Sequence, residues 1–278
     1  MQQHSGLLIS EWPAIIGSDF AGVVVEVGPD TSRLKVGDYV CGVALLGRNR
    51  FAPFQQNFLV QEEIVLKKSP NVALEDSCTI GAGLLTSSLC LLAGLGLDLP
   101  RTAKKAPEKD EWVVILGGTG SVGQYAVQIA HKNGASATFN NRATLNEQVA
   151  DIQRITGGNF GKIMDATAYG YEVMTKALET ASVAETKLMA TVDDWSDIPA
   201  HASIRLYKAE LGHLYLLDEE IGAQVTADIS RWIPYIEAHL DAETLKPIEH
   251  QLVPGIGWEK VIKGIHDLEA GKAEKKIV

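Results

Sequence analysis

Residues 112–123 read WVVILGGTGSVG, a short apolar run followed at once by a cluster of glycines. The run over 112–116 is typical of a strand buried on both faces of a parallel sheet. Gly118, Gly120 and Gly123 then form the pattern G-x-G-x-x-G, and residues 124–132 continue as a helix. A strand, a glycine-rich turn and a helix in this order predict a dinucleotide-binding β-α-β unit.

The three glycines have separate physical roles in such a unit. The first permits a tight turn, the second lets the backbone approach a pyrophosphate, and the third lets the helix pack close to the sheet. Free N–H groups at the start of the helix then bind the phosphates. The alternative interpretation is a glycine-rich connection between strand and helix that binds no ligand.

The residues about 20 positions after Gly118 bear on the choice of nucleotide. NAD-binding units usually carry an acidic residue there, which binds the ribose 2′-hydroxyl. This chain has Asn140, Asn141 and Arg142 instead, at the end of a strand predicted over 136–140. Because a guanidinium pairs well with phosphate, Arg142 favours the 2′-phosphate of NADP. Alternatively, Arg142 is a solvated surface residue.

The remaining sequence predicts two kinds of architecture. Short strands over 20–27, 39–46 and 56–65, joined by glycine-rich turns, indicate a small barrel or sandwich. Residues 71–97 predict helices. Beyond residue 112, strands over 136–140, 162–167 and 186–192 alternate with helices over 144–156 and 171–180, which predicts an α/β, doubly wound parallel sheet. Two apolar stripes at helical spacing predict further helices packed on the core: Ile229, Trp232, Ile233, Ile236 and Leu240, then Val261, Ile262, Ile265 and Leu268.

Composition excludes several classes of function. The net charge of −10, without a long basic stretch, argues against nucleic-acid binding. Cys41, Cys78 and Cys90 follow no metal or disulfide spacing, which indicates reduced thiols. The first residues lack the pattern of a signal peptide, and the uncharged run over 77–97 contains four glycines, which favours a buried helix over a membrane span. We therefore expect a cytoplasmic protein with no membrane or nucleic-acid partner.

Three blocks occur in the order seen in medium-chain dehydrogenases/reductases: GSDFAG over 17–22, VGDYV over 36–40, and the glycine pattern over 118–123. The chain resembles this superfamily over nearly its whole length. Residues 12–42 and the loop before 110–112 resemble the zinc-independent branch, and within it the fungal trans-acting enoyl reductases of polyketide biosynthesis. The resemblance implies a Rossmann-type dinucleotide-binding domain over 76–246. It also implies a partial GroES-like β-barrel domain over 1–75 together with 247–278.

The resemblance also implies site residues. The cofactor contacts would be Gly118, Thr119, Gly120, Ser121, Val122 and Gly123, together with Asn141, at a position that is usually Tyr in relatives, and Arg142. Residues 81–88 match the family's substrate-lining segment, with Thr86 near the nicotinamide as the catalytic candidate and Gly81, Ala82, Gly83, Leu84, Leu85, Ser87 and Ser88 around it. The alternative for Thr86 is a hydroxyl bonded back to the preceding helical turn.

The expected reaction follows from the absence of a metal-ligand set. Gly17-Ser18-Asp19 stands where zinc-dependent relatives have Gly-His-Glu, and the cysteine-rich zinc lobe is missing, so we expect no metal. Without a Lewis acid, reduction of an activated C=C is favoured over oxidation of an alcohol. The resemblance implies NADPH-dependent reduction of an enoyl thioester, as a small molecule or bound to an acyl carrier, beside a polyketide synthase. A quinone or enone reductase is the alternative, and we expect a monomer or homodimer.

Two departures from the family pattern affect this expectation. Relatives have some tens of residues, including an Asn-Pro-x-Asp-x-Lys stretch, before the point that matches Met1. Residues 134–142 are also more similar to the family's third Rossmann strand than to its second, which implies that the second strand and its 2′-phosphate loop are missing. This alignment competes with the spacing argument for Arg142 and implies weakened or abolished cofactor binding. A truncated, non-catalytic paralogue is therefore a further alternative.

Overall fold

The computed structural model describes residues 9, 11–100, 111–130, 135–183, 186–192 and 201–278. The chain divides into two compact units, Met1–Ala82 with Gly212–Val278, and Gly83–Leu211. The sequence instead assigns 76–246 to the nucleotide-binding domain, whereas residues 76–82 and 212–246 belong to the first compact unit. The functional assignment of these ranges stays a prediction.

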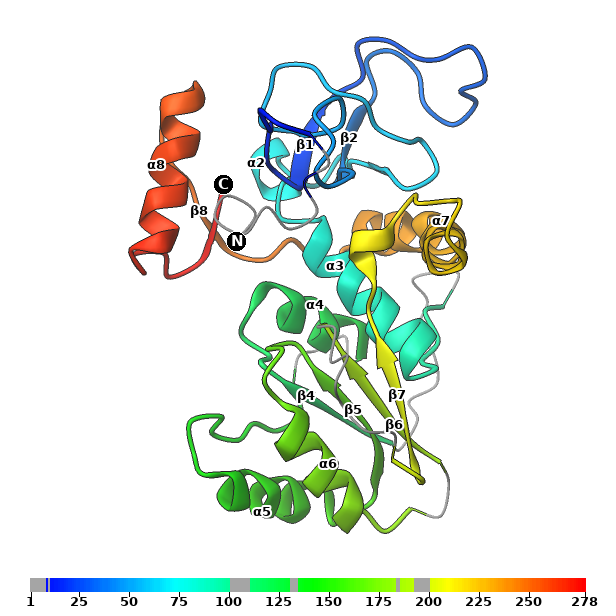
Figure 1. Ribbon diagram of the computed structural model, residues 1–278, viewed down its shortest axis with the longest axis vertical. Coiled ribbons are helices and arrows are strands. Elements are labelled where there is room, and N and C mark those ends of the chain that lie inside the picture. The colour runs from blue at the N-terminus through cyan, green and yellow to red at the C-terminus, as the bar shows by residue number, and fades with distance from the viewer. Residues whose placement is uncertain (1–8, 10, 101–110, 131–134, 184–185, 193–200) are drawn as a thin grey trace. The chain divides into compact units, whose positions relative to one another are not determined.

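A parallel sheet forms the centre of the second unit (Figure 1). Its strands follow chain order: β4 (Trp112–Leu116), β5 (Phe160–Asp165), β6 (Lys187–Thr191) and β7 (Ile204–Lys208). All neighbouring pairs are parallel. The strands predicted at β4, β5 and β6 are confirmed, and β7 is an addition to them. Because β6 pairs with β5 on one side and β7 on the other, it is an inner strand of the sheet.

Helices cover both faces of this sheet. On one face, Val114 and Leu116 of β4 join the core formed with α5 (Leu145–Thr156) and α6 (Tyr171–Thr180). On the other, Val113 and Ile115 pack with the π-helix η1 (Leu89–Gly94) and α4 (Ser121–Ala130). Successive β4 side chains point to opposite faces because side chains alternate with a two-residue period along a strand. The helices predicted at α5 and α6 are confirmed, and α4 overlaps the helix predicted over 124–132 but begins three residues earlier, while the last two predicted residues are outside the described part.

The strand predicted over 136–140 is wrong, because residues 135–143 form no strand. Phe139 packs against the core beside α5, and the Asn140 side chain accepts the Arg142 backbone N–H at 3.0 Å. The α5 helix then begins with a capping box between Thr144 and Glu147. Side chain–backbone bonds of this kind compete with strand pairing. Among the described strands, β4 pairs only with β5, so the described sheet ends at β4.

The first unit contains a small antiparallel sheet and a parallel strand pair. The order in the sheet is β1 (Asp19–Val23), β2 (Tyr39–Val43) and β3 (Leu66–Lys67), and β8 (His250–Gln251) pairs with β9 (Lys276–Ile277). The strands predicted over 20–27 and 39–46 are confirmed in part. The strand predicted over 56–65 is wrong, because these residues form no strand, and Phe58 and Val60 pack on the core from irregular backbone.

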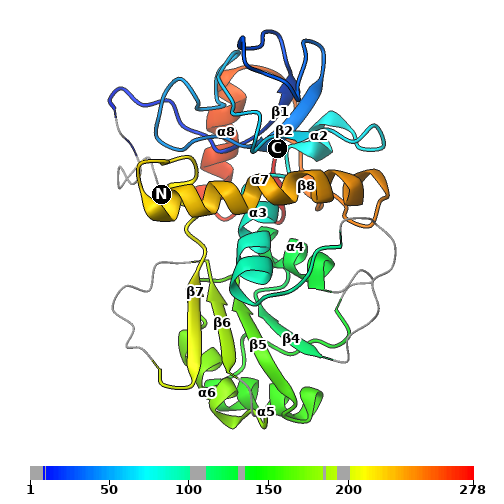
Figure 2. The ribbon, with the colours of Figure 1, turned by 90° about the vertical axis from the view of Figure 1, so that its right-hand side faces the viewer.

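Four helices accompany these strands: α2 (Leu74–Ser77), the 3-10 helix η2 (Leu211–His213), α7 (Glu220–Asp241) and α8 (Trp258–Glu269). The apolar stripe predicted on α7 is confirmed as buried, and Figure 2 shows this long helix side-on. The prediction for α8 is wrong at Ile262 and Leu268, which are 38% and 63% exposed. The only buried α8 residue is Gly264, which packs against Val253 and Ile277.

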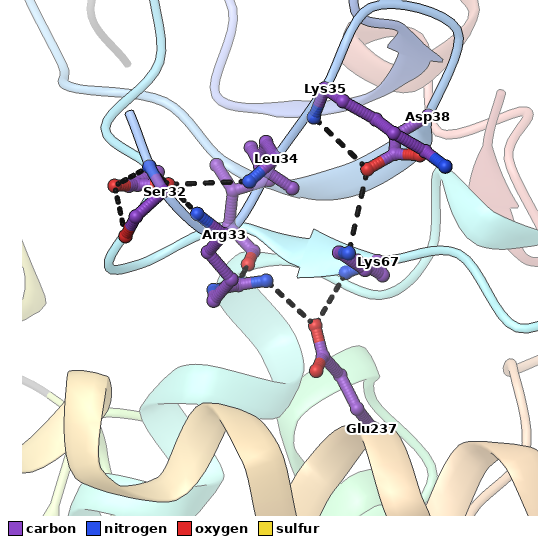
Figure 3. Close-up of polar contacts among 9 residues, drawn as sticks. Ser32, Arg33, Leu34, Lys35, Asp38, Lys67 and Glu237 are labelled. Atoms are coloured by element: carbon purple, nitrogen blue, oxygen red, sulfur yellow. Dashed lines mark hydrogen bonds and ion pairs between the residues drawn. The ribbon is translucent and has the colours of Figure 1, made fainter. Parts of the chain in front are cut away.

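A polar network attaches α7 to the strand region of the same unit (Figure 3). Glu237 Oε1 accepts the Lys67 backbone N–H at 2.6 Å and the Arg33 guanidinium at 3.1 Å. Burial raises the pKa of Glu237, and these two groups partly oppose that shift. The Lys67 side chain pairs with Asp38 at 3.4 Å. The network therefore connects α7, β3 and the turn before β2.

The uncharged run over 77–97 belongs to α2, α3 (Ala82–Ser88) and η1 rather than to one long helix. Within the described ranges, every helix is too short or too polar to cross a membrane. Cys41, Cys78 and Cys90 are free thiols, and Cys41 and Cys90 are buried.

Candidate functional site

β4 leads directly into the glycine-rich turn at the carboxyl end of the parallel sheet. Gly117 has φ +77°, and the Gly120 N–H donates to Gly117 O at 3.1 Å. A Cβ on Gly123 would lie 2.1 Å from Gly117 O, so α4 packs on the turn more closely than any side chain allows. A Cβ on Gly118 would meet only Val127, at an ordinary 3.7 Å. Gly123 is thus required by packing, whereas Gly118 leaves space beside the backbone.

The start of α4 has the features of an anion site. Its first turn has no acidic residue, and the first N–H groups of a helix have no partner within the helix. The Ser121 Oγ is buried and has no hydrogen-bond partner among the described residues. Together with the open side of Gly118, these unpaired donors fit the pyrophosphate of a dinucleotide.

The α3 helix packs against this turn. A Cβ on Gly83 would lie 2.5 Å from Ser121 Oγ and 3.3 Å from the Tyr125 ring, so the two helices approach closely at this glycine. The Ser87 Oγ lies 2.6 Å from Val122 O. The segment predicted to line the substrate therefore contacts, from Gly83 onward, the segment predicted to bind the cofactor.

Thr86 differs from the hydroxyl residues beside it. Ser87 and Ser88 donate to the carbonyls of Gly83 and Leu84 in the preceding turn, at 2.7 and 2.9 Å. The Thr86 side chain makes no hydrogen bond within the described part of the chain, although Thr86 is only 8% exposed. The structure therefore does not support the alternative in which the Thr86 hydroxyl bonds back to the preceding helical turn. Its catalytic role stays a prediction.

The other residues of the predicted substrate segment have different surroundings. Leu84 and Leu85 are fully buried, as are Ser87 and Ser88. The Ala82 N–H contacts Asp19 of β1, and Gly81 approaches the same carboxylate. Substrate contact by these residues stays a prediction.

Asn141 and Arg142 lie on the exposed turn before α5. Neither side chain makes a hydrogen bond or ion pair within the described ranges, and no such bond joins them to residues 117–123. The Arg142 guanidinium is therefore available to an anion, and its pairing with a 2′-phosphate stays a prediction.

Asp165, at the end of β5, is a site residue that the sequence analysis missed. This fully buried carboxylate accepts the Thr167 N–H at 2.8 Å, the Thr167 hydroxyl at 2.6 Å and the Gly170 N–H at 2.9 Å. Thr167 in turn limits Gly117, where a Cβ would lie 2.5 Å from its methyl group. The sequence did contain a signal for Asp165, which is an acidic residue at the end of the strand beside β4. Parallel strands place their carboxyl ends at the same edge of a sheet, so Asp165 could have been expected near the glycine-rich turn.

Comparisons with known proteins agree with this architecture. A family model described as the alcohol dehydrogenase GroES-like domain matches residues 1–69. A putative zinc-dependent alcohol dehydrogenase from Rhizobium etli CFN 42 is similar at TM-score 0.73 and 18% identity, over 95% of this chain and 79% of that chain. A mycobacterial protein complexed with NADPH is similar at TM-score 0.64 and 19% identity, over 98% and 84%. The fold is therefore that of the medium-chain dehydrogenases/reductases.

The sequence relatives are more specific. A trans-enoyl reductase from Fusarium sp. (strain FN080326) is 29% identical, over 95% of this chain and 83% of that protein. The predicted resemblance to medium-chain dehydrogenases/reductases, and within them to fungal trans-enoyl reductases, is confirmed. This alignment spans 308 positions, more than the 278 residues of the chain, so the relative has internal segments without a counterpart here.

Proposed function

We propose that this chain is an NADPH-dependent reductase that reduces the C=C bond of an enoyl thioester made by a polyketide synthase. The observation that carries the proposal is the hydroxyl of Thr86, a mostly buried residue, which has no hydrogen-bond partner in the described protein and lies on a helix packed against the glycine-rich turn. The similarity to trans-enoyl reductases supports the same reaction, and the similarity to a structure complexed with NADPH supports the cofactor. A cytoplasmic location and a monomeric or homodimeric state belong to this proposal.

The residues have distinct roles in the proposed reaction. Backbone N–H groups over 118–123, other than the Gly120 N–H that donates to Gly117 O, hold the pyrophosphate, with the Ser121 hydroxyl as a further donor. Arg142 pairs with the 2′-phosphate, and Asn141 contacts the nucleotide beside it. When bound, NADPH supplies the hydride that the enoyl β-carbon accepts, while the α-carbon takes a proton from water or from an acidic group. Thr86 orients the nicotinamide through its free hydroxyl.

A first experiment tests nucleotide binding through quenching of the five tryptophans. We expect saturable binding of NADPH, tighter than that of NADH. Arg142→Ala should remove this preference, whereas the control Arg205→Ala, at an exposed position on β7, should preserve it. Equal affinities of the wild-type chain for the two nucleotides would contradict the role given to Arg142.

A second experiment tests Thr86 by turnover, followed as NADPH absorbance with an enoyl N-acetylcysteamine thioester. Thr86→Val should lower kcat/KM about tenfold, because one ligand hydrogen bond is lost, and Thr86→Ser should preserve most of it. The matched control is Thr175→Val on α6, since the Thr175 hydroxyl likewise has no hydrogen-bond partner in the described protein. Quinone and enone substrates tested in parallel separate the thioester reductase from the alternative reductases.

A non-catalytic paralogue is a second candidate, because the described sheet ends at β4 and the Fusarium relative contains internal segments that this chain lacks. In that case, a folded chain would bind neither NADPH nor NADH saturably. Circular dichroism on the same sample shows whether the chain is folded, so the two candidates give opposite results in the first titration.

A further inference from the structure

Asp19 forms a polar contact that connects three distant parts of the first unit. Its Oδ1 accepts the Ala82 N–H at 2.7 Å, and its Oδ2 pairs with the Lys276 ammonium of β9. The side chains of Asp19 and Lys276 are only 14% and 18% exposed. This carboxylate therefore joins the start of β1, the start of α3 and the strand β9.

The contact supplies what the start of α3 lacks. Ala82 is the first residue of α3, whose first turn has no acidic residue of its own. A carboxylate at this end satisfies a free N–H and interacts favourably with the helix dipole. A Cβ on Gly81 would lie 2.3 Å from Asp19 Oδ1 and 2.7 Å from Gly42 O, so the close approach requires glycine at this position.

Lys276 makes this arrangement possible. A mostly buried carboxylate is costly without a countercharge, and Lys276 is the cation that contacts it. The lysine is held by β9, which pairs with β8 and is extended by a bond from the Val278 N–H to Gln251 O at 3.0 Å. Cys78 lies nearby, and burial, together with the Asp19 charge, raises the pKa of its thiol.

We infer that Asp19 and Lys276 are positioning residues that fix the first turn of α3, the helix that carries Thr86. The inference rests on the proposed function, because that function assigns α3 to the substrate and nicotinamide. Neither residue is required for nucleotide binding by the turn over 117–123. The pair should therefore influence the handling of the enoyl substrate and leave nucleotide affinity unchanged.

The test compares Lys276→Met, Lys276→Arg, Asp19→Asn and the double variant Asp19→Asn/Lys276→Met. We expect Lys276→Met to lower kcat/KM for the enoyl thioester about tenfold, while the dissociation constant of NADPH stays within about twofold. Lys276→Arg should restore activity, because it keeps the charge. The double variant should be more active than Lys276→Met, since Asn accepts the Ala82 N–H without leaving an unpaired charge.

Amide hydrogen exchange provides a readout that does not depend on turnover. Lys276→Met should raise the exchange rate of the Ala82 amide about tenfold. The control Lys67→Met, which removes the Asp38 ion pair of the same unit, should not change it. Equal exchange in both variants, or a double variant no better than Lys276→Met, overturns the inference. A wild-type chain without turnover refutes the proposed function instead, and the exchange result still decides the role of the pair.

Discussion

Alanine at Gly123 should lower stability and alanine at Gly118 should lower nucleotide affinity, although both glycines belong to one motif. At Gly123 the added methyl group would lie 2.1 Å from Gly117 O and 2.7 Å from the Gly118 Cα. These are backbone atoms, so rotation of a side chain cannot relieve the contact. At Gly118 the nearest atom is a Val127 methyl group at 3.7 Å, which is ordinary contact.

The magnitudes follow from two opposing terms. Alanine in place of glycine within α4 gains about 1 kcal/mol of helix propensity. Forcing a methyl group into a packed backbone costs about 1–3 kcal/mol, and the upper end applies when backbone must move. We therefore expect Gly123→Ala to lose about 2 kcal/mol of stability, or about 4–8 °C in Tm. Gly118→Ala should change stability by less than about 0.5 kcal/mol.

Nucleotide binding distinguishes the same two variants. Because the methyl group of Gly118→Ala would occupy the open side of the turn, we expect NADPH affinity to fall at least about tenfold in a normally folded protein. Thermal denaturation by circular dichroism and the tryptophan titration measure the two effects on one sample. A Gly123→Ala protein as stable as the wild type, or a Gly118→Ala protein that binds NADPH normally, would refute this reasoning.

Three further predictions concern other residues. The backbone N–H groups of Ser32, Arg33 and Leu34 donate to Glu62 and lower the pKa of its carboxyl from the ordinary 4.5. The carboxylate therefore stabilises the fold fully above pH 4.5, and this contribution is lost as the pH falls below that value. Glu62→Gln should flatten the acid side of a plot of Tm against pH. Burial raises the pKa of Cys41 to about 12, so a disulfide reagent at pH 8 should label Cys78 before Cys41, and the reverse order would contradict the assigned burial. Asp165→Ala should cost about 3 kcal/mol in denaturant unfolding, because it leaves the buried Gly170 N–H and the partly buried donors of Thr167 unpaired, whereas an unchanged midpoint would show that water replaces the carboxylate.

The sequence predicts best those elements whose causes are local. The run before Gly117 and the glycines after it determine β4, the turn and the start of α4 within twelve residues. Thr144 and Glu147 likewise start α5, and Gly157 ends it in the left-handed conformation. Each of these signals lies inside or directly beside the element that it determines.

The failures arise where a distant partner decides. Residues 136–140 and 56–65 have strand composition, but a strand forms only beside another strand. Ile262 and Leu268 follow a helical stripe, yet the stripe does not indicate how much of it is covered. The Asp19–Lys276 pair could not be predicted from the sequence either, because 257 positions separate the two residues.

The end of the described sheet at β4 has a consequence for how tightly a nucleotide is retained. In open parallel sheets a ligand crevice normally lies between strands whose connections run to opposite faces, so that it has a wall on each side. Here β5 flanks β4 on one side, and no described strand flanks it on the other. A nucleotide held at such an edge is fixed mainly through its phosphates, and that attraction weakens as salt is added. Such a nucleotide would dissociate rapidly into solvent and behave as a diffusing co-substrate rather than as a permanently bound cofactor.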